Sequence, residues 1–211
     1  MHTIDSLYKL TLSPKINDIS LKLLKDYYEA YLSPYIFTYQ TTDLSKNISF
    51  SVMLSPENFC HLLGIEKIHR FHVNKKYLYQ YYGISGWNNI DTGIITFDSM
   101  KTLNPKGFND NKYKYIYFYS LPRLLENPLA IKFDPIIYKS NGINRRTNLS
   151  FDIVFYDVYD HAFVHLGLIK NETTGYYVPQ SLFVEKEKKV DPYTDNQQTI
   201  IVSKTNITVL L

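Results

Sequence analysis

The chain has 211 residues, of which 45% are hydrophobic and 20% charged, with a formal net charge of +3 at pH 7. This size fits one compact domain, or one domain with a modest extension. The single cysteine, Cys60, excludes a disulfide framework within the chain and any multi-cysteine zinc or iron–sulfur site. The mild positive charge permits a polyanionic substrate without requiring one.

Tyrosine is unusually frequent, with 20 residues in the chain. Tyrosine, isoleucine, lysine and asparagine can all be encoded by AT-rich codons, so the tyrosine total does not by itself indicate an aromatic binding surface. No apolar stretch has the length of a signal-peptide core or of a transmembrane helix. We therefore expect a soluble, cytoplasmic protein that does not contact a membrane.

The first third of the chain mixes helical and extended patterns. Apolar residues at helical spacing predict an amphipathic helix over 16–32, which Pro34 ends. Two β-rich pieces follow at 35–42 and 47–54. Ser55 is then a predicted N-cap, with Pro56 at the first helical position.

The helix that Ser55 opens carries Cys60 and His61, and Gly64 is placed to end it. Residues 75–126 read as helical and loop-rich. We expect a helical run at 77–82, which glycines 83 and 86 break, and then a helix capped by Thr96 or Asp98. A loop is expected at 104–111. A further helical pattern covers 113–127, and Pro122 should kink or split it.

From about residue 130 the hydrophobic period changes from 3.6 to 2. Strands are predicted at 130–133, 149–159, 161–169, 176–185 and 199–210, with tight turns at 159–160 and 171–175. The charged run 185–191 is interpreted as a solvated turn. The predicted fold is α+β, with N-terminal helices packed on a mainly antiparallel sheet of four to five strands. We expect residues 1–50 to form an N-terminal helix and β extension and residues 51–211 to form the main domain.

The strand at 161–169 is the most informative place for chemistry. Alternation puts Ala162, Val164, Leu166 and Leu168 on a core face, and His161, Phe163, His165 and Gly167 on the other. The glycine is expected to leave space above the sheet beside His165. If the next strand pairs across the 171–175 turn, Tyr177 or Ser181 could lie within a few residues of His165.

His61 is the second candidate, on a short and well-capped helix. Its alternative interpretation is a histidine near the core that hydrogen-bonds a backbone carbonyl. His69 and His72 flank Arg70 in a polar stretch and are expected at the surface.

Three positively charged residues are candidates for binding a phosphate group of the substrate. Arg145 and Arg146 are adjacent before a predicted strand, and an arginine guanidinium can grip phosphate through its planar fork. They could equally be a loop pair kept for solubility. Lys67 is a further cation close to the His61 helix. The clustered histidines and carboxylates of a metal site are not evident, and neither a P-loop, a dinucleotide fingerprint nor a nucleophile elbow occurs.

Two stretches carry a resemblance to a known family. The first is NFCHLLG at 58–64, followed by Lys67-Ile68, and the second is HLGL at 165–168, followed by YYVPQSLF at 176–183. Together they resemble the barnase–EndoU–colicin–RelE (BECR) superfamily of nuclease folds, specifically its fourth phage-type branch. The resemblance covers about residues 50–190, with GWNNIDTGIIT and the 118–125 helix in similar order.

The resemblance implies an α+β domain and a ribonuclease that needs neither a metal ion nor another cofactor. It implies that the active-site residues are His61, His165, Tyr177 and Ser181. The expected substrate-binding residues are Lys67, Arg145, Arg146 and Gln180. A catalytic lysine or arginine cannot be matched to the family pattern, and the N-terminal segment of about 50 residues lies outside it.

The leading hypothesis is a metal-independent RNA endonuclease of a toxin or a phage or mobile-element conflict system. RNA supplies its own nucleophile, the 2′-OH, so attack on the adjacent phosphate gives a 2′,3′-cyclic phosphate. His61 and His165 would be the base and acid, in either order. Expected partners are the RNA substrate and an inhibitor, antitoxin or host defence protein. The alternatives are a non-catalytic RNA- or protein-binding module, such as an anti-defence factor, and an enzyme acting on a small nucleotide or a protein.

Overall fold

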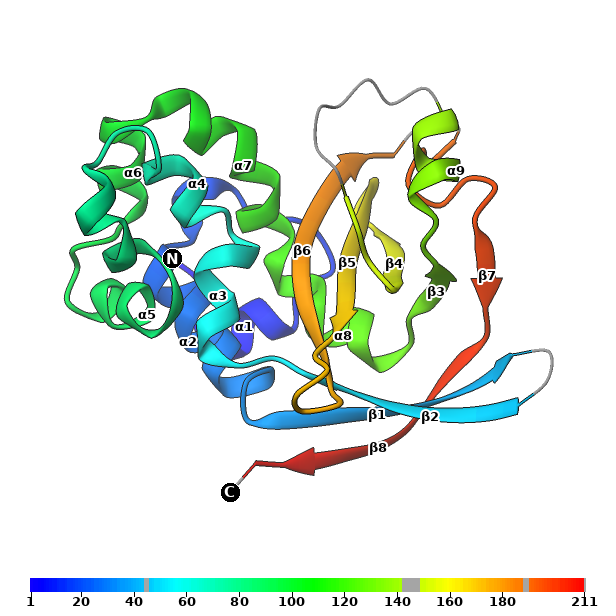
Figure 1. The fold of residues 1–211 in the computed structure, drawn as a ribbon. Helices are drawn as coiled ribbons and strands as arrows, with labels where there is room; N and C mark the ends of the chain where they lie inside the picture. The colour runs from blue at the N-terminus through cyan, green and yellow to red at the C-terminus, as the bar shows by residue number, and fades with distance from the viewer. Residues whose placement is uncertain (44–45, 142–148, 188–189, 211) are drawn as a thin grey trace. The chain divides into compact units, whose positions relative to one another are not determined.

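The computed structural model describes residues 1–43, 46–141, 149–187 and 190–210 (Figure 1). The chain divides into two compact units, each described by itself below. Unit 1 comprises Met1–Tyr35 and Leu54–Pro122, and unit 2 comprises Ile36–Met53 and Arg123–Leu210. Residue 50, where the sequence analysis ended the N-terminal extension, lies within a strand of unit 2.

Unit 1 is helical. Its elements are α1 (Ile4–Tyr8), the 3-10 helix η1 (Ile16–Asp18), α2 (Leu21–Tyr31), α3 (Pro56–Leu62), α4 (Ile65–His69), the 3-10 helix η2 (Lys75–Tyr81), α5 (Gly83–Asp91), α6 (Phe97–Leu103), α7 (Pro105–Tyr117) and the 3-10 helix η3 (Phe118–Ser120). The boundary between the units falls inside α8 (Leu121–Glu126). Within the described residues, every helix is too short or too polar to cross a membrane.

The helix starts follow the predicted capping signals. Ser55 and Asn58 form a reciprocal capping box at the start of α3, and Thr96 forms one with Ser99 at the start of α6. The helix predicted from residue 16 begins at Leu21 instead, because the Ser20 hydroxyl accepts a hydrogen bond from the Leu23 N–H.

Two expectations about the helices of unit 1 are wrong. Residues 105–111 belong to α7 and not to a loop, because Asn104 caps the helix through the Gly107 N–H and Pro105 occupies its first position. Glycine 86 does not break a helix but lies inside α5. A Cβ there would lie 2.8 Å from the Cys60 Sγ, so the missing side chain allows α5 to pack closely on α3.

Aromatic rings form much of the core of unit 1. Phe59 packs edge-on against Tyr28, Trp87 and Phe118, with ring centroids 5.4 to 5.6 Å apart. Edge-to-face pairs of this kind are favourable beyond the area that they bury. Many of the tyrosines are therefore explained by packing, as Tyr27 and Tyr28 are fully buried.

Unit 2 is built on a curled mixed sheet. Its elements are β1 (Tyr35–Asp43), β2 (Lys46–Met53), β3 (Leu129–Lys132), α9 (Pro135–Ser140), β4 (Ile153–Tyr159), β5 (Ala162–Lys170), β6 (Tyr177–Lys186), β7 (Gln198–Ile200) and β8 (Val202–Val209). Within the described residues the strand order is β7-β3-β4-β5-β6-β2-β1-β8. The α+β class is therefore confirmed, whereas the predicted four to five strands are too few.

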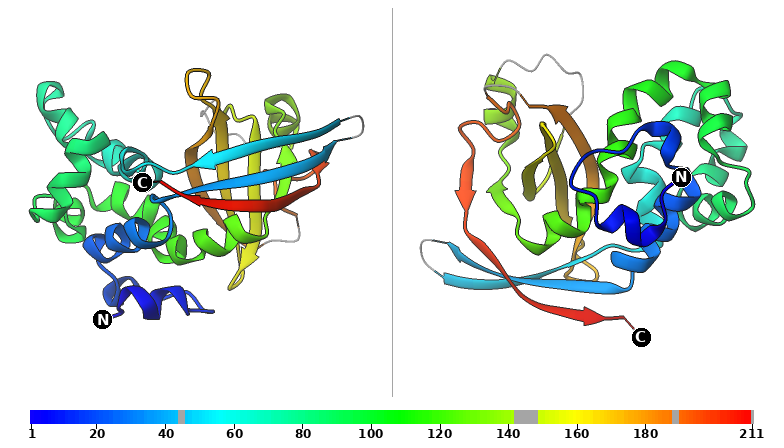
Figure 2. Two further views of the ribbon diagram at one scale, coloured as in Figure 1. Left: turned by 90° about the horizontal axis from the view of Figure 1, so that it is seen from below. Right: turned by 180° about the vertical axis from the view of Figure 1, so that it is seen from behind.

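The sheet is larger than predicted because the β1–β2 hairpin joins it and the predicted strand at 199–210 divides into β7 and β8. β2 pairs in parallel with β6 through Val52 and Tyr177, which adds the β1–β2 hairpin to the predicted meander β4-β5-β6. One residue, Ile201, separates β7 from β8. β7 pairs with β3 and β8 pairs with β1, so these two consecutive strands occupy opposite ends of the strand order. This C-terminal segment bends across the curled sheet (Figures 1 and 2).

Both predicted hairpin turns are confirmed. The turn between β4 and β5 consists of Asp160 and His161, both with positive φ, which matches the twist of the flanking strands. The second turn ends at Gly175, whose φ is +75°. The strand predicted to start at His161 starts at Ala162 instead, because His161 belongs to the turn between β4 and β5.

Gly64 offers a test of the packing in unit 1. Its φ is +70°, and a Cβ would lie 2.5 Å from the Oδ1 atom of buried Asn111 on α7. We expect Gly64→Ala to lower the free energy of unfolding by about 2–3 kcal/mol, from left-handed strain plus the clash. Gly93 has a similar φ of +74° but open space at the Cβ position, so Gly93→Ala is expected to cost only about 1 kcal/mol. Equal losses in urea denaturation would contradict the packing described for Gly64.

Candidate functional site

His165 lies in the centre of β5 with its side chain fully buried. Its Nε2 atom lies 2.7 Å from Oδ2 of Asp191, and its Nδ1 atom lies 3.4 Å from the Phe183 carbonyl oxygen. The Phe183 ring stacks on the imidazole at a centroid distance of 4.7 Å. In this conformation the imidazole is enclosed by residues of unit 2, and both of its nitrogens have partners.

The space expected above Gly167 is absent. A Cβ at this position would lie 2.5 Å from the Phe151 ring, so an aromatic side chain fills the space. Phe151 belongs to a second apolar cluster with Ile131, Phe133, Tyr138, Val154 and Tyr193. Alternation correctly placed the first core face of β5, but it could not show that the other face is also covered.

Asp191 corrects a second expectation. The run 185–191 is not simply a solvated turn, because Asp191 is 6% exposed and accepts hydrogen bonds from the Thr194 hydroxyl and the Tyr193 N–H. Burial alone would raise the pKa of this carboxyl, but the hydrogen bond from His165 and those from Thr194 and Tyr193 hold it below its ordinary value. The spacing of Asp191 and Thr194, typical of a side-chain-capped turn, was the available sequence signal.

A β-bulge in β6 decides where the predicted site residues point. Gly167 pairs with Ser181 but Leu168 pairs with Pro179, so Gln180 is the extra residue. Ser181 therefore shares the His165 face. Beyond the bulge the alternation is inverted, and Tyr177, opposite Lys170, lies on the other face of the sheet. His165 and Tyr177 thus do not meet, contrary to the juxtaposition that regular alternation suggested.

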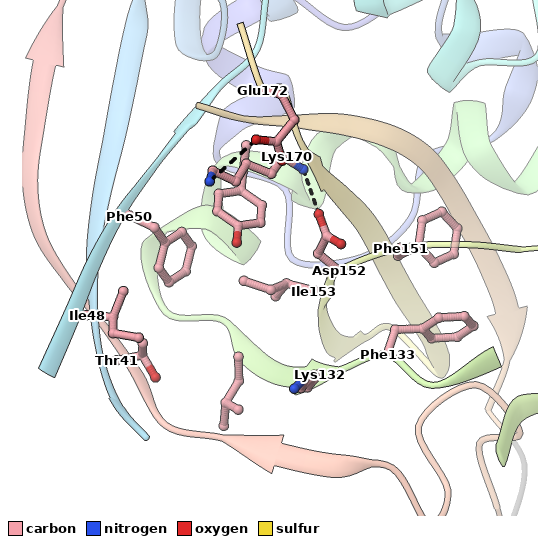
Figure 3. Close-up of a pocket in the computed structure, with 12 residues that line it drawn as sticks. Thr41, Ile48, Phe50, Lys132, Phe133, Phe151, Asp152, Ile153, Lys170 and Glu172 are labelled. Carbon is pink, nitrogen blue, oxygen red and sulfur yellow. Dashed lines mark hydrogen bonds and ion pairs between the residues drawn. The ribbon is translucent and has the colours of Figure 1, made fainter. Parts of the chain in front are cut away.

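Tyr177 lines a pocket of about 450 Å³ within unit 2, which we call the sheet pocket (Figure 3). Its apolar wall includes Phe50, whose ring packs edge-on against Tyr177 at 5.2 Å. The charged and polar residues that line it are Thr41, Lys132, Asp152, Lys170, Glu172 and Tyr177. The sheet pocket combines aromatic surface, two cations, two carboxylates and a phenol.

The charged groups of the sheet pocket are held by local turns and strand ends. One carboxylate oxygen of Asp152 accepts the Lys170 N–H at 2.7 Å, which fixes the carboxylate at the edge of the pocket (Figure 3). Lys170 Nζ lies 3.8 Å from Oε2 of Glu172. Both side chains of this pair are substantially exposed, so the attraction is weak and the ammonium can turn toward an incoming anion.

The Tyr177 hydroxyl remains protonated at neutral pH. Burial, together with the negative charges of Asp152 and Glu172, raises the pKa of Tyr177 above its ordinary value. A protonated phenol in a pocket with lysines can donate a hydrogen bond to a phosphate oxygen. Lys132, Asp152, Lys170 and Glu172 were not singled out from the sequence, because charged residues at strand ends are common and only the fold brings these together.

The remaining predicted residues lie elsewhere. His61 and Lys67 are exposed on α3 and α4 of unit 1. Ser181 is half-buried and Gln180 exposed on β6. Arg145 and Arg146 lie outside the described residues. The pairing of His61 with His165 involves two units and stays a prediction.

Two further findings concern unit 1. Lys114 on α7 was missed from the sequence; burial and the positive charge of nearby Lys67 lower its pKa to about 8. His69 is not at the surface as expected but 2% exposed, with its ring stacked on Tyr81 at 3.8 Å and Nδ1 2.7 Å from the Ile65 carbonyl oxygen. His72 is exposed, as predicted.

Comparison with known proteins identifies the family. The family described as phage-Barnase-EndoU-ColicinE5/D-RelE like nuclease4 (PBECR4) matches residues 21–209. The chain belongs to this family. The resemblance seen in the two sequence stretches is thus confirmed, and the match also includes β1 and the start of β2, which lay outside the resemblance.

Family membership supports a nuclease of the BECR type in general. No curated protein and no solved structure gave a match to the chain. Within the part of the chain that the structure describes, no group of three or more histidine, cysteine, aspartate or glutamate residues could hold a metal ion.

Proposed function

We propose that the protein is an RNA endonuclease that cleaves without a metal ion and uses the sheet pocket of unit 2 as its active site. The proposal rests on one observation: Tyr177, two lysines and two carboxylates line the same pocket. These are the groups that proton transfer and phosphate binding require. The chain that contains this pocket belongs to a nuclease family.

The proposed reaction begins with the 2′-OH of RNA. A carboxylate of Asp152 or Glu172 accepts its proton, and the resulting oxygen attacks the adjacent phosphorus. The bond to the 5′-oxygen breaks, that oxygen takes a proton from solvent water, and the product is a 2′,3′-cyclic phosphate. Lys132 and Lys170 offset the negative charge of the phosphate, and the Tyr177 hydroxyl donates a hydrogen bond to it.

The histidines take different roles in this proposal. His165 acts as a structural residue that holds Asp191 and its turn against β5, because its ring is enclosed. His61 is exposed on α3 of unit 1, so its role as an acid or base is a proposal separate from the sheet pocket. Lys67, Ser181 and Gln180 do not line the sheet pocket, and Arg145 and Arg146 lie outside the described residues, so their roles in contacting or orienting the substrate are separate proposals.

The competing function is a non-catalytic RNA- or protein-binding module. The buried position of His165 favours this binding module, because the strand alternation had predicted that the imidazole would contact a substrate. For either function we propose a role in a phage or mobile-element conflict, with an inhibitor or host defence protein as a partner. The family description names phages, which supports this setting.

Incubation of the purified protein with a defined RNA in EDTA tests the proposal. We expect endonucleolytic fragments whose 3′ ends carry 2′,3′-cyclic phosphate, detected by mass spectrometry. The variants His61→Ala and Tyr177→Phe, compared with wild type, then report the contribution of each side chain. Intact RNA under all conditions would favour the binding module.

A further inference from the structure

A second surface, on unit 1, combines exposed aromatic rings with lysines. It consists of residues 71–84, which we call the aromatic–basic segment. Its most exposed rings are those of Phe71, Tyr77, Tyr79 and Tyr82, which are 86%, 47%, 50% and 43% exposed. So much aromatic surface in one short segment is unusual, because large apolar groups in water are normally scattered singly.

The electrostatics of this segment favour an anionic partner. From Lys67 to Ile90 the chain has no acidic residue. Arg70 is paired with Glu66 at 2.7 Å, but Lys75 and Lys76 are exposed within the segment, beside the exposed imidazole of His72. Lys76 Nζ lies 4.7 Å from the centroid of the Tyr77 ring, so cation and ring form one surface.

The 3-10 geometry of η2 aligns part of this surface. Residues three apart eclipse in such a helix, so Lys76 and Tyr79 lie on the same side, about 6 Å apart along the axis. Leu78 and Tyr81 lie on another side and are only half exposed. The helical period therefore places Lys76 and Tyr79 on one exposed row, whereas the row of Leu78 and Tyr81 is exposed only at its first residue, Lys75.

The segment is anchored rather than loose. The ring of Tyr81 stacks on buried His69, and the Asn89 side-chain amide donates to the Gln80 carbonyl oxygen at 2.9 Å. The Asn74 side chain caps η2 through the Lys76 N–H. The exposed rings are thus carried on a fixed backbone, which reduces the ordering cost of binding.

We propose that the aromatic–basic segment binds single-stranded RNA by stacking bases on Tyr79 and its neighbouring rings while Lys75 and Lys76 contact phosphates. Stacking on aromatic side chains beside cations is how proteins hold single strands without reading their sequence. In naming RNA the inference rests on the proposed function, but it assigns a binding surface separate from the sheet pocket. If a protein partner occupied the segment instead, the RNA probe described next would bind independently of Tyr79, Lys75 and Lys76.

The test measures binding without cleavage. The probe is a 20-nucleotide, fluorescein-labelled 2′-O-methyl oligouridine, which lacks the free 2′-OH, and the readout is fluorescence anisotropy at several salt concentrations. We expect Tyr79→Ala to weaken the Kd about 5- to 100-fold and Tyr79→Phe to bind like wild type, because the ring carries the stacking. The double variant Lys75→Ala/Lys76→Ala should reduce the salt slope of log K by about 1.4.

Matched controls lie on α7 of the same unit. Tyr113 is 39% exposed and Lys106 is exposed, so Tyr113→Ala and Lys106→Ala should bind like wild type. Wild-type affinity in Tyr79→Ala, or an equal loss in the controls, would overturn the inference. Binding to the probe by a protein that fails to cleave RNA would count against the proposed function alone.

Discussion

Replacing Asp191 with alanine is expected to lower the free energy of unfolding by about 3–5 kcal/mol, because it removes one partner of a buried pair. Oδ2 of Asp191 lies 2.7 Å from Nε2 of His165, and the two side chains are 4% and 0% exposed. The substitution leaves the imidazole nitrogen and the Thr194 hydroxyl without their acceptor. A buried hydrogen-bond donor that has lost its acceptor lowers the free energy of unfolding.

The pH dependence of this effect follows from the direction of the pKa shift. The pKa of Asp191 is lower in the folded than in the unfolded chain, so its contribution is fully present above the unfolded-state value of about 4. As the pH falls through the folded-state pKa, the carboxylate is protonated and the contribution is lost. The difference between wild type and Asp191→Ala should therefore shrink in acid.

Glu187 provides the matched control. Its Oε2 atom lies 3.4 Å from Nδ1 of His161, in a pair whose side chains are 46% and 91% exposed. Solvent screening makes such pairs weak, so Glu187→Ala is expected to change the free energy of unfolding by less than about 1 kcal/mol. Urea denaturation of both variants at neutral pH compares the two pairs directly. Similar small losses would mean that the His165–Asp191 contact does not stabilise unit 2.

Tyr177→Phe is expected to reduce the rate of RNA cleavage about 100-fold, as is typical when one hydrogen-bond donor to a developing negative charge is removed. The substitution keeps the ring and its edge-on contact with Phe50, so the stability should change little. Because the lost interaction is made in the transition state, kcat should fall while KM stays similar.

Tyr156→Phe is the matched control for this experiment. Tyr156 lies in β4 of the same sheet, pairs with His165 and is half-buried, but it faces away from the sheet pocket. We expect it to cleave RNA at the wild-type rate. Equal activity of Tyr177→Phe and wild type would remove Tyr177 from the proposed mechanism, and equal losses in both variants would point to a general effect on the sheet.

Local signals predicted much of the fold. The caps at Ser55 and Thr96, the helix stop at Gly64 and the two hairpin turns of the meander all depend on neighbouring residues, and all are confirmed. The missed α9 also begins with a readable signal, because Asp134 caps it and Pro135 occupies its first position. What remained hidden depends on distant residues, such as the parallel pairing of β2 with β6.

The candidate site was harder to predict for the same reason. Alternation selected His165 and Tyr177, but the single extra residue at Gln180 inverts the pattern and puts them on opposite faces. The partner of His165 is 26 residues away in a segment interpreted as solvated. The sheet pocket joins residues from β1 to β7, so no local pattern could have revealed it.

The chemistry of the cleavage reaction is the central claim, and one pair of substrates tests it most directly. A 20-nucleotide RNA and the same sequence with every 2′-OH methylated are incubated with the wild-type protein in EDTA. Our account predicts that the RNA is cut, that its fragments carry 2′,3′-cyclic phosphate, and that the methylated strand stays intact. Cleavage of both strands, or of neither, would contradict it.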